Sequence, residues 1–163
     1  MIDNVTQELT ERLAKAMLNH ELSLVTAESC TGGGISHCVT SIAGSSLWFD
    51  RGYVTYTNDA KRECLNVSSE TLAGFGAVSE ECAAEMALGA LQNSHADIAV
   101  SVTGIAGPGG GSEDKPVGTV CFGWCRRDQS TVTTRVVFEG DREQVRRQSV
   151  LLALQGLLDM LEA

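Results

Sequence analysis

The segment TAESCTGGG, from Thr26 to Gly34, predicts a sharp passage from a buried strand into a helix. An apolar stretch at residues 22–27 leads into it, and beyond it apolar residues recur at helical spacing over residues 35–42. The three glycines let the backbone turn tightly and come close to a ligand. We therefore expect Ser29 and Cys30 to lie where free N–H groups at a helix start favour negative charge.

This junction suits a nucleophile that attacks a carbonyl carbon, because backbone donors stand ready for the carbonyl oxygen. Ser29 is the first candidate for that nucleophile. Cys30 is its rival, since a thiol beside a helix N-terminus has a lowered pKa. A glycine-rich turn between strand and helix also occurs in folds without chemistry at that place, so the turn alone decides nothing.

Strands and helices are expected to alternate along most of the chain, which predicts an α/β fold. The pattern favours a three-layer α/β/α arrangement with a mixed central sheet, because one hairpin accompanies the crossover units. The 163 residues show no linker or repeat, so we expect a single domain over residues 1–163. Strands are expected at residues 22–27, 52–57, 97–103, 118–125 and 131–138. Helices are expected at residues 3–20, after Gly34, after the capping residue Asn58 and within residues 67–77. Two more helices are expected to begin at Ser79 and at the capping box of Asp141 and Gln144.

The charge balance argues against nucleic acid as a partner. Acidic residues outnumber basic ones by 21 to 12, which gives a formal net charge of -9. Polyanions need a basic footprint, and the only local clusters are Arg126-Arg127 and Arg142, Arg146 and Arg147. No targeting signal and no apolar run long enough to cross a bilayer is visible, so we expect a cytoplasmic protein with no membrane partner.

Six cysteines, at positions 30, 38, 64, 82, 121 and 125, are spread through the expected helices and strands. None forms a CxxC pair, and the histidines are not spaced with them as metal ligands. We read these cysteines as small buried apolar residues in a reducing compartment, and we expect no metal site.

A serine nucleophile needs a base, and a lysine is the better candidate in this chain. His20 and His95 sit at expected helix ends, and His37 lies two turns into the helix after Ser29. Lysine can accept a proton when burial lowers its pKa. Lys61 follows the strand GYVTYT, so both it and Ser29 would stand just past strand ends, the usual edge for ligand sites in α/β domains. The plainer interpretation is a solvated helix lysine.

The loop GIAGPGGGSEDKP follows the second β-branched run and holds both prolines of the chain. It matches neither a P-loop nor a dinucleotide fingerprint in its expected context. Its glycines and Thr103 could present N–H groups to a phosphate or a carbonyl group. A flexible surface loop is the alternative.

Five segments together resemble the CinA C-terminal domain family, which includes stand-alone nicotinamide-nucleotide amidohydrolases. They are TAESCTGGG, AGSSLWFDRGYVTYTNDAK, GAVSEE, SVTGIAGPGGGSEDKPVGTV and FEGDREQVRRQ, in order over nearly the whole chain. The resemblance implies hydrolysis of the carboxamide of nicotinamide mononucleotide to nicotinate mononucleotide and ammonia. It further implies no metal and no cofactor, a small-molecule substrate and a homo-oligomer.

The resemblance also implies roles for individual residues. Ser29 would be the nucleophile, Lys61 its general base, and Tyr56 a proton relay or orienting hydroxyl group. Donors at Thr31 and Gly32 would hold the oxyanion, and Arg142 is a candidate for the substrate phosphate. The expected substrate-binding residues are Thr31, Gly32, Gly33, Thr103, Gly104 and Arg142.

Two other readings remain open from the sequence. One is a catalytically silent module of this family that binds a nucleotide or a partner. The other is a hydrolase in which Cys30 replaces Ser29 as the nucleophile. Longer family members carry an N-terminal domain associated with hydrolysis of ADP-ribose or related pyrophosphates, for which this chain has no room, so that activity is not expected.

Overall fold

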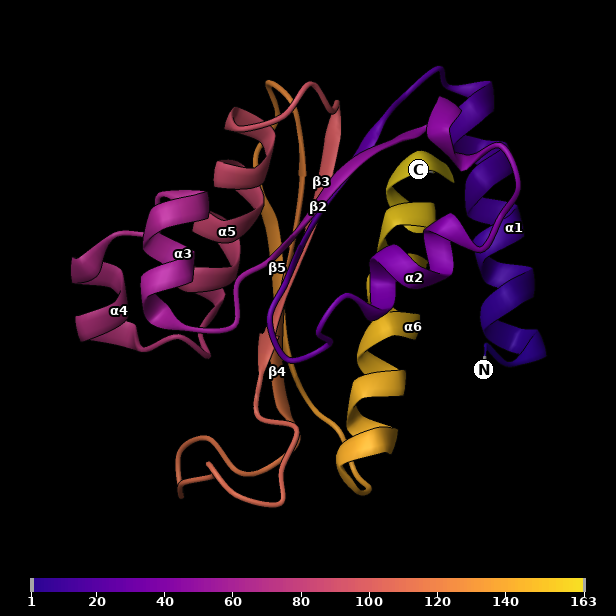
Figure 1. The fold of residues 1–163 in the computed structure, drawn as a ribbon. Helices are drawn as coiled ribbons and strands as arrows, with labels where there is room; N and C mark the ends of the chain where they lie inside the picture. Colours follow the sequence, from indigo (N-terminus) through magenta and orange to yellow (C-terminus); the bar gives the residue numbers. More distant parts are fainter. Residues whose placement is uncertain (1, 163) are drawn as a thin grey trace.

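One five-stranded sheet forms the middle layer of the protein (Figure 1). The structure, a computed structural model, describes residues 2–162. The strands are β1 (Leu24–Glu28), β2 (Phe49–Val54), β3 (Ile98–Gly104), β4 (Thr119–Arg126) and β5 (Val132–Val137). They lie in the order β2-β1-β3-β4-β5, with β2, β1 and β3 parallel and with β4 and β5 each antiparallel to the strand before it.

Helices cover both faces of this sheet. They are α1 (Asn4–Asn19), α2 (Gly34–Thr40), the short 3-10 helix η1 (Ser45–Leu47), α3 (Asn58–Leu65), α4 (Ser69–Phe75), α5 (Glu80–Gln92) and α6 (Arg142–Glu162). Figure 1 shows α3, α4 and α5 on one face and α1, α2 and α6 on the other. The three-layer α/β/α arrangement with a mixed sheet confirms the expected fold class.

The central strands contribute side chains to two apolar cores, one on each face of the sheet. Along β3, Val100 and Val102 pack into the core beneath α1, α2 and α6, whereas Ala99 packs into the core beneath α3 and α5. Successive side chains of a strand point to opposite faces, so a strand covered on both faces needs apolar residues at nearly every position. This explains why β1 and β3 are buried along almost their whole length.

The segment before Lys61 differs from the expectation by a few residues. A strand was expected at residues 52–57, but β2 ends at Val54. Asn58 was expected to cap the next helix, but Thr57 does so, because its backbone is extended and its hydroxyl oxygen accepts from the Ala60 N–H at 3.1 Å. α3 therefore begins at Asn58, which places Lys61 in the first turns of the helix.

The C-terminal half follows the sequence pattern closely. β4 and β5 form the expected hairpin. At the start of α6, the Asp141 N–H donates to Gln144 Oε1 at 2.8 Å and the Gln144 N–H donates to Asp141 Oδ1 at 2.9 Å. These reciprocal bonds confirm the expected capping box. They fix the start of the helix that carries Arg142 and Arg146.

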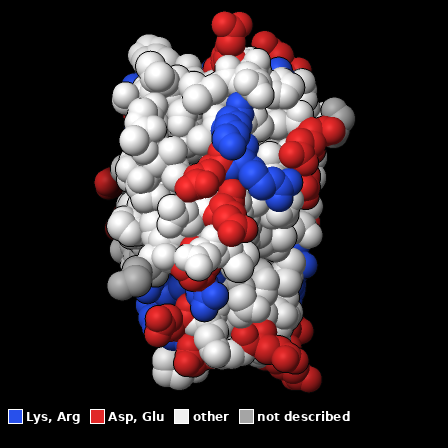
Figure 2. All heavy atoms as spheres, turned by 90° about the vertical axis from the view of Figure 1, so that its right-hand side faces the viewer, with Lys and Arg blue, Asp and Glu red and all other residues white. Residues whose placement is uncertain are grey.

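Acidic and basic side chains lie close together on the face formed by α1, α2 and α6 (Figure 2). Ion pairs join Arg147 to Asp3 at 2.7 Å and Arg12 to Glu162 at 3.7 Å. Within residues 2–162, no helix has the length and apolar character needed to cross a membrane.

Candidate active site

Ser29 and Lys61 are in direct contact although 32 positions separate them in the chain. Lys61 Nζ lies 3.0 Å from Ser29 Oγ and donates a second hydrogen bond of 2.9 Å to the Thr55 carbonyl oxygen. The Lys61 side chain is almost fully enclosed, since the residue is only 2% exposed. The structure thus rules out the reading of Lys61 as a solvated lysine.

The fold makes this contact because β1 and β2 are parallel neighbours. Their carboxyl ends meet at one edge of the sheet, where the Thr55 N–H still donates to the Glu28 carbonyl oxygen at 2.9 Å. Ser29 follows β1 and α3 follows β2, so both side chains reach that edge. Gly89 of α5 lets α3 pack closely against α5, because a Cβ at this position would lie 1.8 Å from the Leu65 carbonyl oxygen.

Burial lowers the pKa of Lys61 below its ordinary value of 10.5. The Cys82 and Cys30 thiols are the groups with an opposing effect, and burial raises their own pKa values to about 11 and about 12, which leaves them uncharged near neutrality. These thiols therefore do little to stabilise the protonated form of the Lys61 amine. In the neutral form, one N–H donates to the Thr55 carbonyl oxygen and the lone pair can face the Ser29 hydroxyl group.

A cavity of about 230 Å³ opens in front of Ser29. Lys61 does not line it, so its amine lies behind Ser29 as seen from the cavity. The glycine-rich loop after β3 forms one wall of the cavity, and Arg142 lines it as well. The lining residues are Ser29, Cys30, Tyr56, Gly104, Ile105, Ala106, Gly107, Gly109, Gly110 and Arg142.

The turn after Ser29 offers two backbone donors. Gly32 and Gly33 have φ values of 58° and 99°, which favour glycine at both positions. The Gly32 N–H, expected to hold an oxyanion, donates instead to the Ser29 carbonyl oxygen at 3.0 Å. Among the described residues, the Cys30 and Thr31 N–H groups have no acceptor.

Three other expected substrate-binding residues do not line the cavity. The Thr31 hydroxyl group donates to Glu28 Oε1 at 2.7 Å, and the Thr103 hydroxyl group donates to the Ala77 carbonyl oxygen at 2.9 Å. Gly33 stands just before α2 as its N-cap residue. Gly104 does line the cavity, as expected. Thr31 and Gly33 therefore shape the turn, and Thr103 packs towards α5.

Tyr56 and Arg142 meet at the mouth of the cavity. Arg142 donates from Nη2 to the Tyr56 hydroxyl oxygen at 3.0 Å and from Nη1 to the Gly107 carbonyl oxygen at 2.8 Å. Within the described residues, no hydrogen bond joins the Tyr56 hydroxyl group to Ser29 or Lys61. Tyr56 thus orients Arg142 in this structure.

Cys30 lacks the properties of a reactive thiol. Its side chain packs in the core beneath α2 and α6, and burial raises its pKa to about 12. The expected lowering by the helix N-terminus is wrong here, because the cost of burying a thiolate outweighs the local dipole.

We expect Cys30→Ala to keep turnover at the wild-type order of magnitude, because burial keeps the thiol protonated. Steady-state kinetics and a thermal melt of this variant provide the check. Loss of turnover in a folded Cys30→Ala protein would favour the cysteine mechanism.

The sequence analysis missed two side chains that shape the Ser29 turn. Glu28 is fully buried and accepts hydrogen bonds from the turn and from α2. Arg146 donates to the carbonyl oxygens of Cys30 at 3.1 Å and Thr31 at 3.2 Å. A carboxylate inside an apolar strand run was the available signal for Glu28. Arg146 was visible in the sequence only as a member of a basic cluster, one helical turn after Arg142, and no local pattern indicated its contact with the turn.

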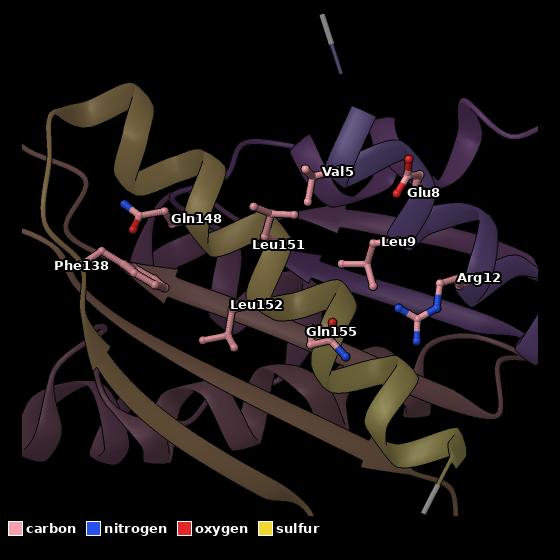
Figure 3. Close-up of a pocket in the computed structure, with 9 residues that line it drawn as sticks. All are labelled: Val5, Glu8, Leu9, Arg12, Phe138, Gln148, Leu151, Leu152 and Gln155. Atoms are coloured by element: carbon pink, nitrogen blue, oxygen red, sulfur yellow. The ribbon is translucent and has the colours of Figure 1, made fainter. Parts of the chain in front are cut away.

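A larger hollow of about 480 Å³ lies between α1 and α6 (Figure 3). Its walls are mainly apolar, with Leu9, Leu151 and Phe138 among them, and Glu8 and Arg12 at the rim. It holds no nucleophile with a base. Among the described residues, no cluster of three or more His, Cys, Asp or Glu side chains is placed to bind a metal ion.

Comparisons with known proteins agree on one family. The model of the CinA C-terminal domain matches residues 6–161. The nicotinamide-nucleotide amidohydrolase PncC of Escherichia coli strain K12 is 51% identical over 157 residues, which cover 96% of this chain and 95% of that protein. PncC of Pseudomonas putida is 48% identical over 153 residues, covering 93% and 94%. The crystal structure of the competence/damage inducible protein CihA from Agrobacterium tumefaciens superposes with a TM-score of 0.96 at 46% identity, covering 100% of this chain and 99% of that one.

Proposed function

Because the chain belongs to the CinA C-terminal domain family, we propose that it is a nicotinamide-nucleotide amidohydrolase. It hydrolyses the carboxamide of nicotinamide mononucleotide and yields nicotinate mononucleotide and ammonia. The observation that carries this proposal is the buried Lys61 amine, 3.0 Å from the Ser29 hydroxyl oxygen at the inner end of a cavity. An assay of ammonia release from nicotinamide mononucleotide tests it.

In the first half of the reaction, Ser29 Oγ attacks the carboxamide carbon. Its proton passes to the neutral Lys61 amine, and the carbonyl oxygen becomes an oxyanion. We assign the Cys30 N–H group as its donor, because Cys30 lines the cavity and its N–H lacks an acceptor in the described part of the chain. Lys61 then gives the proton to the leaving nitrogen, the oxyanion re-forms the carbonyl group as the C–N bond breaks, and ammonia departs, which leaves an ester on Ser29.

In the second half, water cleaves this ester. Lys61 takes a proton from the water molecule, whose oxygen attacks the acyl carbon, and returns the proton to Ser29 Oγ as the bond to the ester oxygen breaks; the carboxylic acid that leaves gives its remaining proton to solvent and becomes nicotinate mononucleotide. The net reaction consumes one water and releases one ammonia. Lys61 acts as base and acid in turn, which requires a pKa low enough for the neutral form to be populated.

We assign the substrate phosphate to Arg142, the only lysine or arginine side chain among the residues that line the cavity. Tyr56 orients its guanidinium group. Backbone N–H groups of the loop at residues 104–110 lie in the same wall and would add neutral donors.

Arg142→Ala is expected to raise KM for nicotinamide mononucleotide about tenfold or more, since a charge-assisted hydrogen bond contributes about 1.5–3 kcal/mol. The kcat value should change little, because Arg142 does not touch Ser29. Nicotinamide riboside, the same compound without phosphate, should show a much smaller effect. Arg147→Ala is the matched control, since Arg147 pairs with Asp3. An equal rise in KM for both compounds would contradict the phosphate assignment.

We further propose that residues 1–163 form one domain that works in the cytoplasm as a homo-oligomer. The family match over residues 6–161 supports the single domain, and the six free cysteines fit a reducing compartment. Size-exclusion chromatography with light scattering measures the oligomeric state.

A further inference from the structure

The Glu28 carboxylate lies fully buried beside the Ser29 turn. Its Oε1 accepts from the Thr31 hydroxyl group at 2.7 Å and from the Ile35 N–H at 2.8 Å. Its Oε2 accepts from the Ser36 N–H at 3.0 Å and from the Ser36 hydroxyl group at 2.8 Å. All four donors belong to the turn after Ser29 or to α2.

Glu28 replaces the cap that α2 does not have locally. The first N–H groups of a helix need acceptors, and a side chain at the N-cap position usually provides one. The N-cap of α2 is Gly33, whose φ of 99° favours a residue without a side chain. The carboxylate of Glu28 reaches over the turn and accepts from Ile35 and Ser36. These hydrogen bonds thereby join the two ends of the segment at residues 28–36, which contains Ser29, the proposed nucleophile.

This network also ties the turn to the sheet. The Ser36 and Thr26 hydroxyl oxygens are 2.8 Å apart, so a chain of hydrogen bonds runs from β1 through α2 to Glu28. Gly52 of β2 leaves room for it, because a Cβ there would lie 2.6 Å from Ser36 Oγ. From α6, Arg146 donates to the carbonyl oxygens of Cys30 and Thr31. The turn is therefore anchored on two sides.

We propose that Glu28 is a positioning residue for the hydrolysis proposed above. It holds the Ser29 backbone so that Oγ stays within reach of Lys61 Nζ, and it fixes the direction of the Cys30 N–H group. Glu28 touches neither Ser29 Oγ nor the cavity. Burying a carboxylate costs free energy unless its oxygens accept hydrogen bonds, and here four donors provide them.

Glu28→Gln tests this role, because glutamine keeps the shape but turns one acceptor oxygen into an NH₂ group that faces two donors. We expect kcat to fall about 10²-fold, since a displacement of about 1 Å in a reacting group has that effect. KM should stay close to its wild-type value. Ser36→Ala removes one of the four donors and should cause a smaller loss of kcat.

Glu85→Gln is the matched control. The Glu85 carboxylate accepts from the Ser68 N–H at 2.9 Å and from the Thr71 hydroxyl group, and so caps α4 away from the Ser29 cavity. Its loss should lower the melting temperature and leave kcat unchanged. A Glu28→Gln protein that is folded and retains wild-type kcat would overturn the proposal, as would a loss of kcat that merely follows the melting temperature in both variants.

Labelling of Ser29 by a fluorophosphonate separates this inference from the choice of substrate, because the probe needs only an activated serine. We expect Glu28→Gln to be labelled about 10²-fold more slowly than wild type, and Glu85→Gln at the wild-type rate. Equal labelling rates in all three proteins would overturn the positioning role. If wild type is labelled but releases no ammonia from the nucleotide, the proposed substrate fails, and the labelling rates still decide the role of Glu28.

Discussion

Replacing Ser29 by alanine is expected to abolish ammonia release from nicotinamide mononucleotide and to leave the fold intact. Ser29 Oγ is the atom that both contacts Lys61 Nζ and faces the cavity. Without it no acyl-enzyme forms, so kcat should fall by at least about 10⁴-fold, as is usual for loss of a catalytic nucleophile. The side chain is small, and its removal leaves little empty space. A coupled ammonia assay and a thermal melt measure both effects.

Cys30→Ala provides the control for Ser29→Ala, because the two residues are adjacent and both line the cavity. Full activity of a folded Ser29→Ala protein would dismiss the serine mechanism. A wild-type protein that binds the nucleotide, as shown by calorimetry, and never turns it over would favour the reading as a silent binding module.

Lys61→Met is expected to lower kcat/KM by about 10³-fold, which is within the usual contribution of a general base. Methionine keeps most of the volume and apolar character of the lysine stem, so the core beneath α3 should stay filled. For wild type, kcat/KM should rise with pH and level off above the pKa of Lys61, because only the neutral amine accepts the Ser29 proton. Lys61→Met should lack this dependence. Its retention of wild-type kcat/KM would contradict the role of Lys61 as base.

The same substitution is expected to stabilise the protein. The pKa of Lys61 lies below 10.5 in the folded state, so the unfolded chain binds more protons between that pKa and 10.5. This difference lowers the free energy of unfolding of the wild type. The loss is absent above pH 10.5, grows as the pH falls through this window, and is constant below it. Lys61→Met removes the loss, so the difference in free energy of unfolding between Lys61→Met and wild type should grow as the pH falls through the same range. Denaturant titrations at several pH values measure it, with Lys15→Met as the control.

The fold followed from local patterns because most elements carry their own signals. Apolar spacing marked α6, and the reciprocal pair of Asp141 and Gln144 marked its start. Apolar residues at nearly every position marked β1 and β3, which helices cover on both faces. The glycines after Ser29 marked the turn, since the φ values of Gly32 and Gly33 suit few other residues.

The arrangement of the site depends on packing between distant segments, which no local pattern contains. Lys61 stands among polar neighbours in a short helix and is nevertheless buried, in a helix on which α5 packs closely at Gly89. The residue pattern made Ser29 and Lys61 candidates and the resemblance to a family gave them roles, but their contact depends on β1 and β2 being neighbours. Local reasoning about Cys30 was wrong because its burial outweighs the effect of the nearby helix. Glu28 was missed because its four donors come from residues up to eight positions away.

A direct NMR titration of the lysine side chains tests whether an unprotonated Lys61 stands ready to accept the Ser29 proton. The chain has three lysines, Lys15, Lys61 and Lys115, so protein labelled with ¹³Cε-lysine gives three signals, and Lys61→Met identifies one of them. The mechanism predicts that the Lys61 signal titrates below the ordinary lysine pKa of about 10.4, because burial disfavours the charged amine. A Lys61 signal that titrates at or above pH 10.4 would contradict it, because Lys61 would then be a protonated ammonium group near neutrality.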